Sequence, residues 1–143
     1  MKLLAAIATL AAGIGGWFYR QREKKGLRVD KRYRGQAKRA MDLLERKTGL
    51  RFRHENIRLI TPIGTRYERG LWMRWVADPP GHDPGYYAGF WQGSGHCVAV
   101  LDPQGNVHDG VLEHEFGHEL YDQNRIPIAE HHARMRRDGV FMG

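Results

Sequence analysis

Apolar positions form one long unbroken run near the start of the chain and only short periodic groups after it. The run from Leu3 to Tyr19 holds seventeen residues without a charge. As a helix it would cover about 25 Å, close to the ~30 Å hydrocarbon core of a bilayer. Its end is aromatic, which suits the headgroup interface, and no small-residue cleavage site follows it. The pattern therefore predicts a transmembrane anchor over residues 1–19, with a secretory signal as the alternative.

After a stretch of basic residues, the pattern changes to alternating helix and strand periods. Apolar residues at helical spacing predict a helix over 36–47, and Thr48-Gly49 provides its stop. Short apolar or aromatic runs predict strands at 57–60, 71–76, 86–91 and 96–101. The strand at 96–101 is the clearest of these, and the proline- and glycine-rich stretch 78–85 predicts a loop.

Two further helices are expected at the end of the chain. The first runs over 110–124, with Asp109 as the better placed cap, and the second over 128–137, with Pro127 in its first turn. The expected fold class is α+β: an N-terminal helix, a short mixed sheet, a long helix and a short C-terminal helix. We assign this domain to residues 35–143, behind a basic juxtamembrane linker at 20–34.

Charge refines this picture because it is distributed unevenly. The net charge is +7, but ten Lys and Arg residues lie between Arg20 and Arg39 against two acidic ones. From Gly70 to Gly143 there are five Lys and Arg residues and ten acidic residues. A basic segment directly after an apolar run indicates a membrane surface, and no nucleic-acid partner is expected. The positive-inside rule favours a cytoplasmic domain, whereas a secreted or periplasmic one follows from the signal alternative.

The candidate chemistry lies in the predicted helix 110–124. His114, Glu115 and His118 form the pattern HExxH. Residues four apart share a helix face, so the two imidazoles can bind one Zn²⁺. The glutamate between them is then close enough to act on a water molecule bound to the metal. With eight His and eight Glu in 143 residues, chance would supply only roughly 0.02 matches. The single cysteine, Cys97, excludes a disulfide within the chain and is expected to be a small buried strand residue.

Between Gly95 and Arg134 the chain resembles the zincin superfamily of metallopeptidases, in which a strand precedes the HExxH helix and the chain then turns back to deliver a third ligand. The resemblance implies that Glu115 is the general base and that His114 and His118 bind zinc. Tyr121 and Asn124 depart from the HExxHxxGxxH pattern of the metzincins. The third ligand is expected among the residues after the break at Pro127, with His131 preferred and with Glu130 and His132 as alternatives.

The leading functional hypothesis is therefore a membrane-anchored zinc metallopeptidase that hydrolyses peptide bonds in a peptide or protein substrate. The strand at 96–101 would hold that substrate in an extended conformation. One alternative is a catalytically inactive zinc-binding protein of the same fold that acts at a membrane or on a partner. Another is a basic surface-binding protein with an accidental HExxH. Tyr86, Tyr87 and Tyr121 are weaker candidates for polarising the scissile carbonyl.

Overall fold

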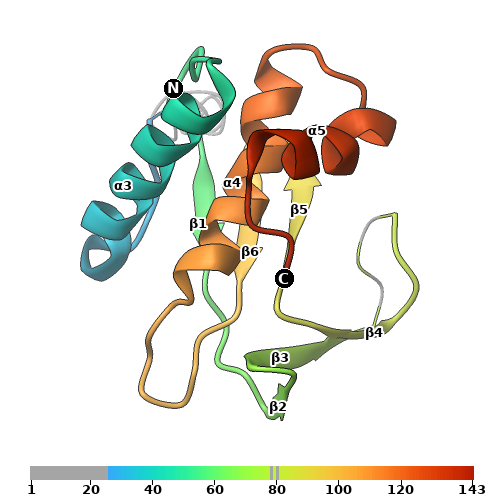
Figure 1. The fold of residues 1–143 in the computed structure, drawn as a ribbon. Coiled ribbons are helices and arrows are strands. Elements are labelled where there is room, and N and C mark those ends of the chain that lie inside the picture. The colour runs from blue at the N-terminus through green and yellow to red at the C-terminus, as the bar shows by residue number, and fades with distance from the viewer. Residues whose placement is uncertain (1–25, 78, 80) are drawn as a thin grey trace, which may run out of the picture.

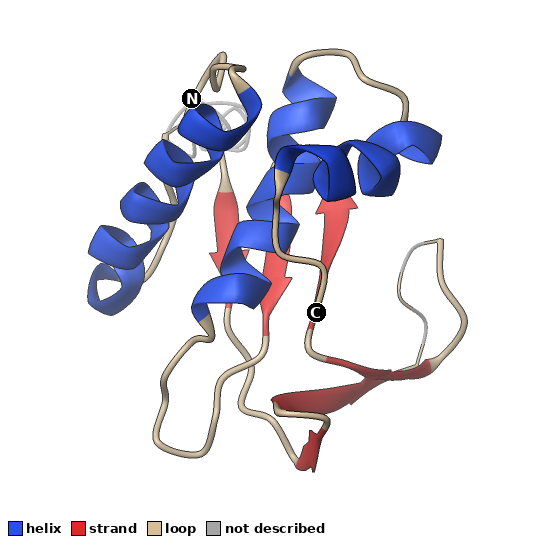
Figure 2. Cartoon of the chain, in the orientation of Figure 1, coloured by secondary structure: helices blue, strands red, loops and turns tan. Residues whose placement is uncertain are grey.

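The computed structural model describes residues 26–77, 79 and 81–143, and within them the fold is α+β, as predicted (Figures 1 and 2). The elements are α3 (Lys31–Thr48), β1 (Arg58–Ile60), β2 (Arg66–Glu68), β3 (Leu71–Val76), β4 (Gly85–Tyr87), β5 (Gly89–Gly93), β6 (His96–Ala99), α4 (Asp109–Gln123), the 3-10 turn η1 (Ile128–Glu130) and α5 (His131–Asp138). The proposed anchor at 1–19 lies outside the described residues. In the described part, no helix combines the length and the apolar character that a membrane crossing requires.

Helix α3 begins earlier than its apolar pattern predicted. The Asp30 side chain accepts a hydrogen bond from the backbone N–H of Arg32 and caps the helix, so Lys31 to Arg34 are helical and not part of a linker. At the other end Gly49 adopts the left-handed conformation, with φ of 75°, as the predicted stop requires. The first turn was missed because three of its four residues are basic, although the buried Tyr33 continues the apolar spacing of the helix.

In the described part of the chain, six strands form two separate three-stranded sheets. In the first, β6 lies in the centre, parallel to β1 and antiparallel to β5. In the second, β3 pairs with β2 and β4, all antiparallel, and Figure 1 shows this sheet beyond one end of the first. The single strand predicted at 86–91 is therefore wrong: Ala88 separates β4 from β5, which belong to different sheets. Strand β2 was not predicted, and β6 ends at Ala99 rather than at residue 101.

The core lies between the first sheet and the two long helices. Leu44 of α3, Leu112 and Phe116 of α4 and Cys97 of β6 are fully buried there, which confirms the expectation for the cysteine. Helix α4 packs against α3, β5 and β6. Its cap is His108 and not Asp109, because the Nδ1 atom of His108 accepts from the N–H groups of Gly110 and Val111. One face of α4 therefore lies against β5.

Strand β5 approaches α4 so closely that only glycine fits at its first residue. A Cβ atom built on Gly89 would lie 2.6 Å from the carbonyl oxygen of Val98 and 2.8 Å from Val111 Cγ1. It would also lie 3.3 Å from the Cγ atom of Glu115. The absence of a side chain at Gly89 therefore allows β5 to lie directly beside Glu115.

Candidate metal centre

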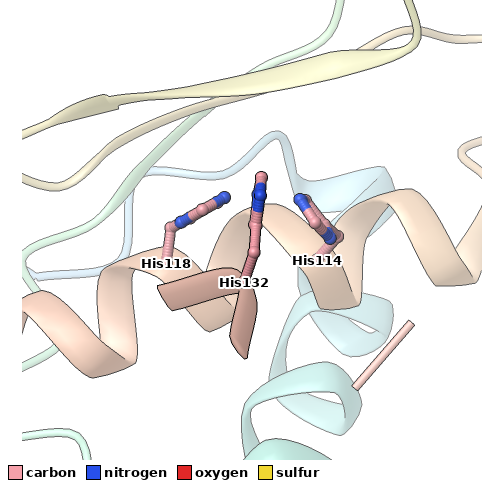
Figure 3. A group of neighbouring side chains, drawn as sticks. All are labelled: His114, His118 and His132. Carbon is pink, nitrogen blue, oxygen red and sulfur yellow. The ribbon is translucent and has the colours of Figure 1, made fainter. Parts of the chain in front are cut away.

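Three histidine side chains from two helices converge on one point (Figure 3). His114 and His118 lie one turn apart on α4, with their ring centroids 4.9 Å apart. The third is His132 from α5, whose ring centroid lies 5.3 Å from that of His114 and 5.1 Å from that of His118. One ligand nitrogen from each ring lies within 4.8 Å of the others, so the three residues are close enough to hold a metal ion.

The expected third member, His131, lies outside this group of three histidines in the structure. The His131 side chain is fully buried, and its ring lies against His118, Trp91 and Tyr121. Its Nδ1 atom is 2.9 Å from Nδ1 of His118, and its Nε2 atom is 2.9 Å from the carbonyl oxygen of Ile126. Both ring nitrogens of His131 are thus engaged in hydrogen bonds within the protein.

Glu130, the other alternative, is also outside the group. It ends η1 with an exposed carboxylate that lies 3.7 Å from the Nε atom of Arg134. Of the three residues considered, only His132 faces both His114 and His118, so it is the third member of the group. Adjacent helical residues point about 100° apart, so α5 can direct His131 inward to the core and His132 toward α4 at the same time.

The hydrogen bonds of His131 determine which nitrogen of His118 faces the group. The carbonyl oxygen of Ile126 can only accept, so His131 Nε2 donates to it. In the neutral ring the Nδ1 atom of His131 then has no proton, and it accepts from Nδ1 of His118. Burial, with neighbouring histidines, lowers the pKa of His118 to about 3, and burial also lowers that of His131. Both rings are therefore neutral at pH 7, and Nε2 of His118 keeps a lone pair for a metal.

His114 is held in the same tautomer by a different partner. Its Nδ1 atom lies 2.8 Å from the carbonyl oxygen of Phe141, to which it must donate. Burial lowers the pKa of His114, so its ring too is neutral and Nε2 carries the lone pair. Partners of this kind fix the tautomer and the orientation of metal-binding histidines. Both histidines of α4 are thus prepared to bind through Nε2.

Glu115 lies between the two histidines in sequence and is 6% exposed. Burial raises the pKa of its carboxyl group to about 8. A cation held by the three histidines would favour the carboxylate and move this pKa downward, toward the neutral range in which a general base works best. The surroundings of Glu115 therefore suit a group that takes up and releases a proton near pH 7.

A cavity of about 590 Å³ opens over the group. Its floor holds the three clustered histidines and Glu115. Its walls come from β4, β5, the preceding loop and η1, through the residues Gly81, His82, Tyr87, Gly89, Phe90, Trp91, Gln92, Gly93, Ile128 and Ala129. Among the described lining residues, only Glu115 and the histidines have side chains that can carry a charge near neutral pH. The site is therefore open to a ligand of peptide size and is bordered by aromatic and aliphatic groups.

Trp91 fixes one wall of this cavity. Its indole ring is stacked on His118, with ring planes 13° apart, and its Nε1 atom donates to Glu119 Oε1 over 2.9 Å. Glu119 is 2% exposed and also accepts from the backbone N–H of Gly95, so it joins α4 to β5 and to the β5–β6 turn. The sequence did not predict this role of Trp91, because its contacts with His118 and Glu119 depend on how β5 packs against α4.

The tyrosines and the other histidine near the site lie in different surroundings. Three tyrosines were considered as donors to the scissile carbonyl of a substrate, and of these only Tyr87 lines the cavity. Its hydroxyl donates to the carbonyl oxygen of Asp83. Tyr121 is fully buried and donates to Asp138, whereas Tyr86 packs against Trp75. His82 is exposed and lies beside Tyr87 in the cavity wall.

No protein-family model, curated protein or solved structure matches the chain.

Proposed function

We propose that the protein is a zinc-dependent metallopeptidase of the zincin type that hydrolyses peptide bonds. The observation that carries the proposal is the convergence of His114, His118 and His132 beside a buried Glu115 at the floor of an open cavity. Imidazole is a preferred ligand of zinc, and three protein ligands with an open position characterise catalytic rather than structural zinc sites. The donor set therefore fits zinc.

The chain's own residues account for the proton transfers of such a reaction. Zinc, when bound, supplies a Lewis acid that lowers the pKa of water to about 7 and polarises a carbonyl oxygen. Glu115 accepts the proton of the attacking water on a carboxylate oxygen and donates it to the leaving amine. His131 and the carbonyl oxygen of Phe141 hold the two α4 histidines in the tautomer that binds through Nε2.

The structure changes which strand is proposed to bind the substrate. The strand at 96–101 was expected to do so, but β6 is paired on both sides, with β1 and β5, so that expectation is wrong. Strand β5 is an edge strand of this sheet, and all five of its residues line the cavity. An exposed edge can pair with an extended peptide through main-chain hydrogen bonds. We propose that β5 holds the substrate beside Glu115.

The membrane assignment remains part of the proposal. The uncharged run of Leu3–Tyr19 and the basic residues that follow it support an N-terminal anchor. The catalytic domain would then act close to a membrane surface.

Removal of metal should abolish hydrolysis reversibly. Full-length protein purified in mild detergent would be treated with a strong chelator, dialysed, and assayed against a mixture of unstructured peptides by mass spectrometry. We expect no cleavage by the metal-free protein and recovered cleavage after addition of one equivalent of zinc, because the three histidines supply the only proposed site for the Lewis acid. Cleavage by the metal-free protein, or none by the zinc-loaded one, would contradict the proposal.

A further inference from the structure

The segment Gly139–Phe141, which we term the tail segment, contacts α4 at two consecutive residues, Glu113 and His114. The backbone N–H of Phe141 donates to Glu113 Oε2 over 3.0 Å, and its carbonyl oxygen accepts from His114 Nδ1 over 2.8 Å. One peptide residue of the tail segment therefore connects the carboxylate of Glu113 with the ring of His114. The position of that carbonyl oxygen depends on what holds Phe141.

Lys47 holds the tail segment from the other side. Its Nζ atom lies 2.7 Å from Glu113 Oε2 and donates over 2.9 Å to the carbonyl oxygen of Gly139. The Glu113 side chain is 10% exposed and that of Lys47 is 31% exposed. A partly buried ion pair that also makes hydrogen bonds constrains its neighbours more strongly than an exposed pair does. Lys47 belongs to the last turn of α3, so the contact joins α3, α4 and the tail segment.

Apolar contacts seat the rest of the tail segment. Val140 is 3% exposed, and its backbone N–H donates to the carbonyl oxygen of Met135. The ring of Phe141 packs against His108, at a centroid separation of 5.4 Å. It also covers Gly110, where a Cβ atom would lie only 2.6 Å from the phenyl ring. The first turn of α4 is thus shaped to receive Phe141.

We propose that the tail segment positions His114 for metal binding and that Lys47 and Glu113 are positioning residues that act through it. The inference rests on the proposed metal site. The carbonyl oxygen of Phe141 fixes the tautomer and the ring plane of His114, and the ion pair fixes the carbonyl oxygen. Loss of such a partner typically weakens metal binding about 10–100-fold. A purely structural role would lower the stability of the fold and leave the affinity of the folded protein for metal unchanged.

Substitutions at Glu113 separate the two roles. Glu113→Gln keeps an oxygen that can accept from Phe141 and Lys47, whereas Glu113→Leu removes the acceptor. Zinc affinity would be measured by competition with a chromophoric chelator, and the site would be inspected through the visible spectrum of the Co²⁺-loaded protein. We expect Glu113→Leu and Lys47→Met to weaken zinc binding about tenfold and to alter the Co²⁺ spectrum, with Glu113→Gln close to the wild type.

A second pair of variants guards against misfolding of Glu113→Leu. Deletion of residues 141–143 removes both the phenyl ring and the carbonyl oxygen, whereas Phe141→Ala removes only the ring. We expect the deletion to bind zinc about tenfold more weakly than Phe141→Ala. Equal zinc affinities in both comparisons would overturn the inference while leaving the peptidase proposal intact. A wild-type protein that binds no zinc would overturn both, and one that binds zinc but cleaves no peptide would overturn the peptidase proposal alone.

Discussion

Replacement of Glu115 by glutamine should lower the rate of peptide hydrolysis by about 10²–10⁴-fold, the usual contribution of a general base, while zinc remains bound. Glutamine has nearly the same size, so it fits the tight space between Gly89 and α4. It cannot accept the proton of the attacking water, and that loss affects turnover rather than metal affinity. Steady-state kinetics and metal analysis of the same preparation would check both expectations.

The control for this variant is Glu119→Gln. That glutamate lies four residues further along α4 and is also buried, but its oxygens are bonded to Trp91, Gly95 and Gln123. Glu119→Gln should retain a much larger share of the activity than Glu115→Gln. Undiminished hydrolysis by Glu115→Gln would remove Glu115 from the mechanism. Zinc binding without hydrolysis in the wild type would instead favour the inactive zinc-binding alternative.

Replacement of His132 by alanine should cost more metal affinity than any change at His131. His132→Ala removes one of three ligands, whereas His131→Phe removes only the hydrogen-bond partner of His118. We expect the zinc dissociation constant to rise about 10–100-fold for His131→Phe and by a larger factor for His132→Ala. Competition with a chromophoric chelator would measure both constants.

His131→Gln is the matched control, because a glutamine oxygen can accept from Nδ1 of His118 as the His131 ring does. This variant should bind zinc more tightly than His131→Phe. A larger loss of affinity in His131→Phe than in His132→Ala would reverse the assigned roles of these neighbours.

The sequence alone could not decide between His131 and His132. The HExxH spacing predicted that His114 and His118 share a helix face, because helical geometry alone determines that relation. Which of His131 and His132 turns toward them depends on the rotation of α5 about its axis. That rotation follows from the 3-10 turn η1 and from the fully buried His131 and Met135, and neither is visible in a local pattern.

The fold was predictable where local chemistry was decisive. Gly49 and Pro127 marked a helix end and a helix break correctly, and the apolar run at 71–76 is strand β3. The aromatic run at 86–91 was misleading, because it is divided between two sheets by Ala88. Sheet order is a tertiary property, so the edge position of β5, on which substrate binding is proposed to depend, was not predictable from strand periodicity.

A crystal structure of the zinc-loaded protein, with the metal located by anomalous scattering, would show directly whether the three histidines bind zinc. We predict one zinc ion bound to the Nε2 atoms of His114 and His118 and to His132, at about 2.0–2.1 Å. Glu115 should lie beside the ion without binding it, and His131 should remain bonded to His118. Zinc bound by His131, or a zinc-loaded crystal with no metal between α4 and α5, would contradict the account.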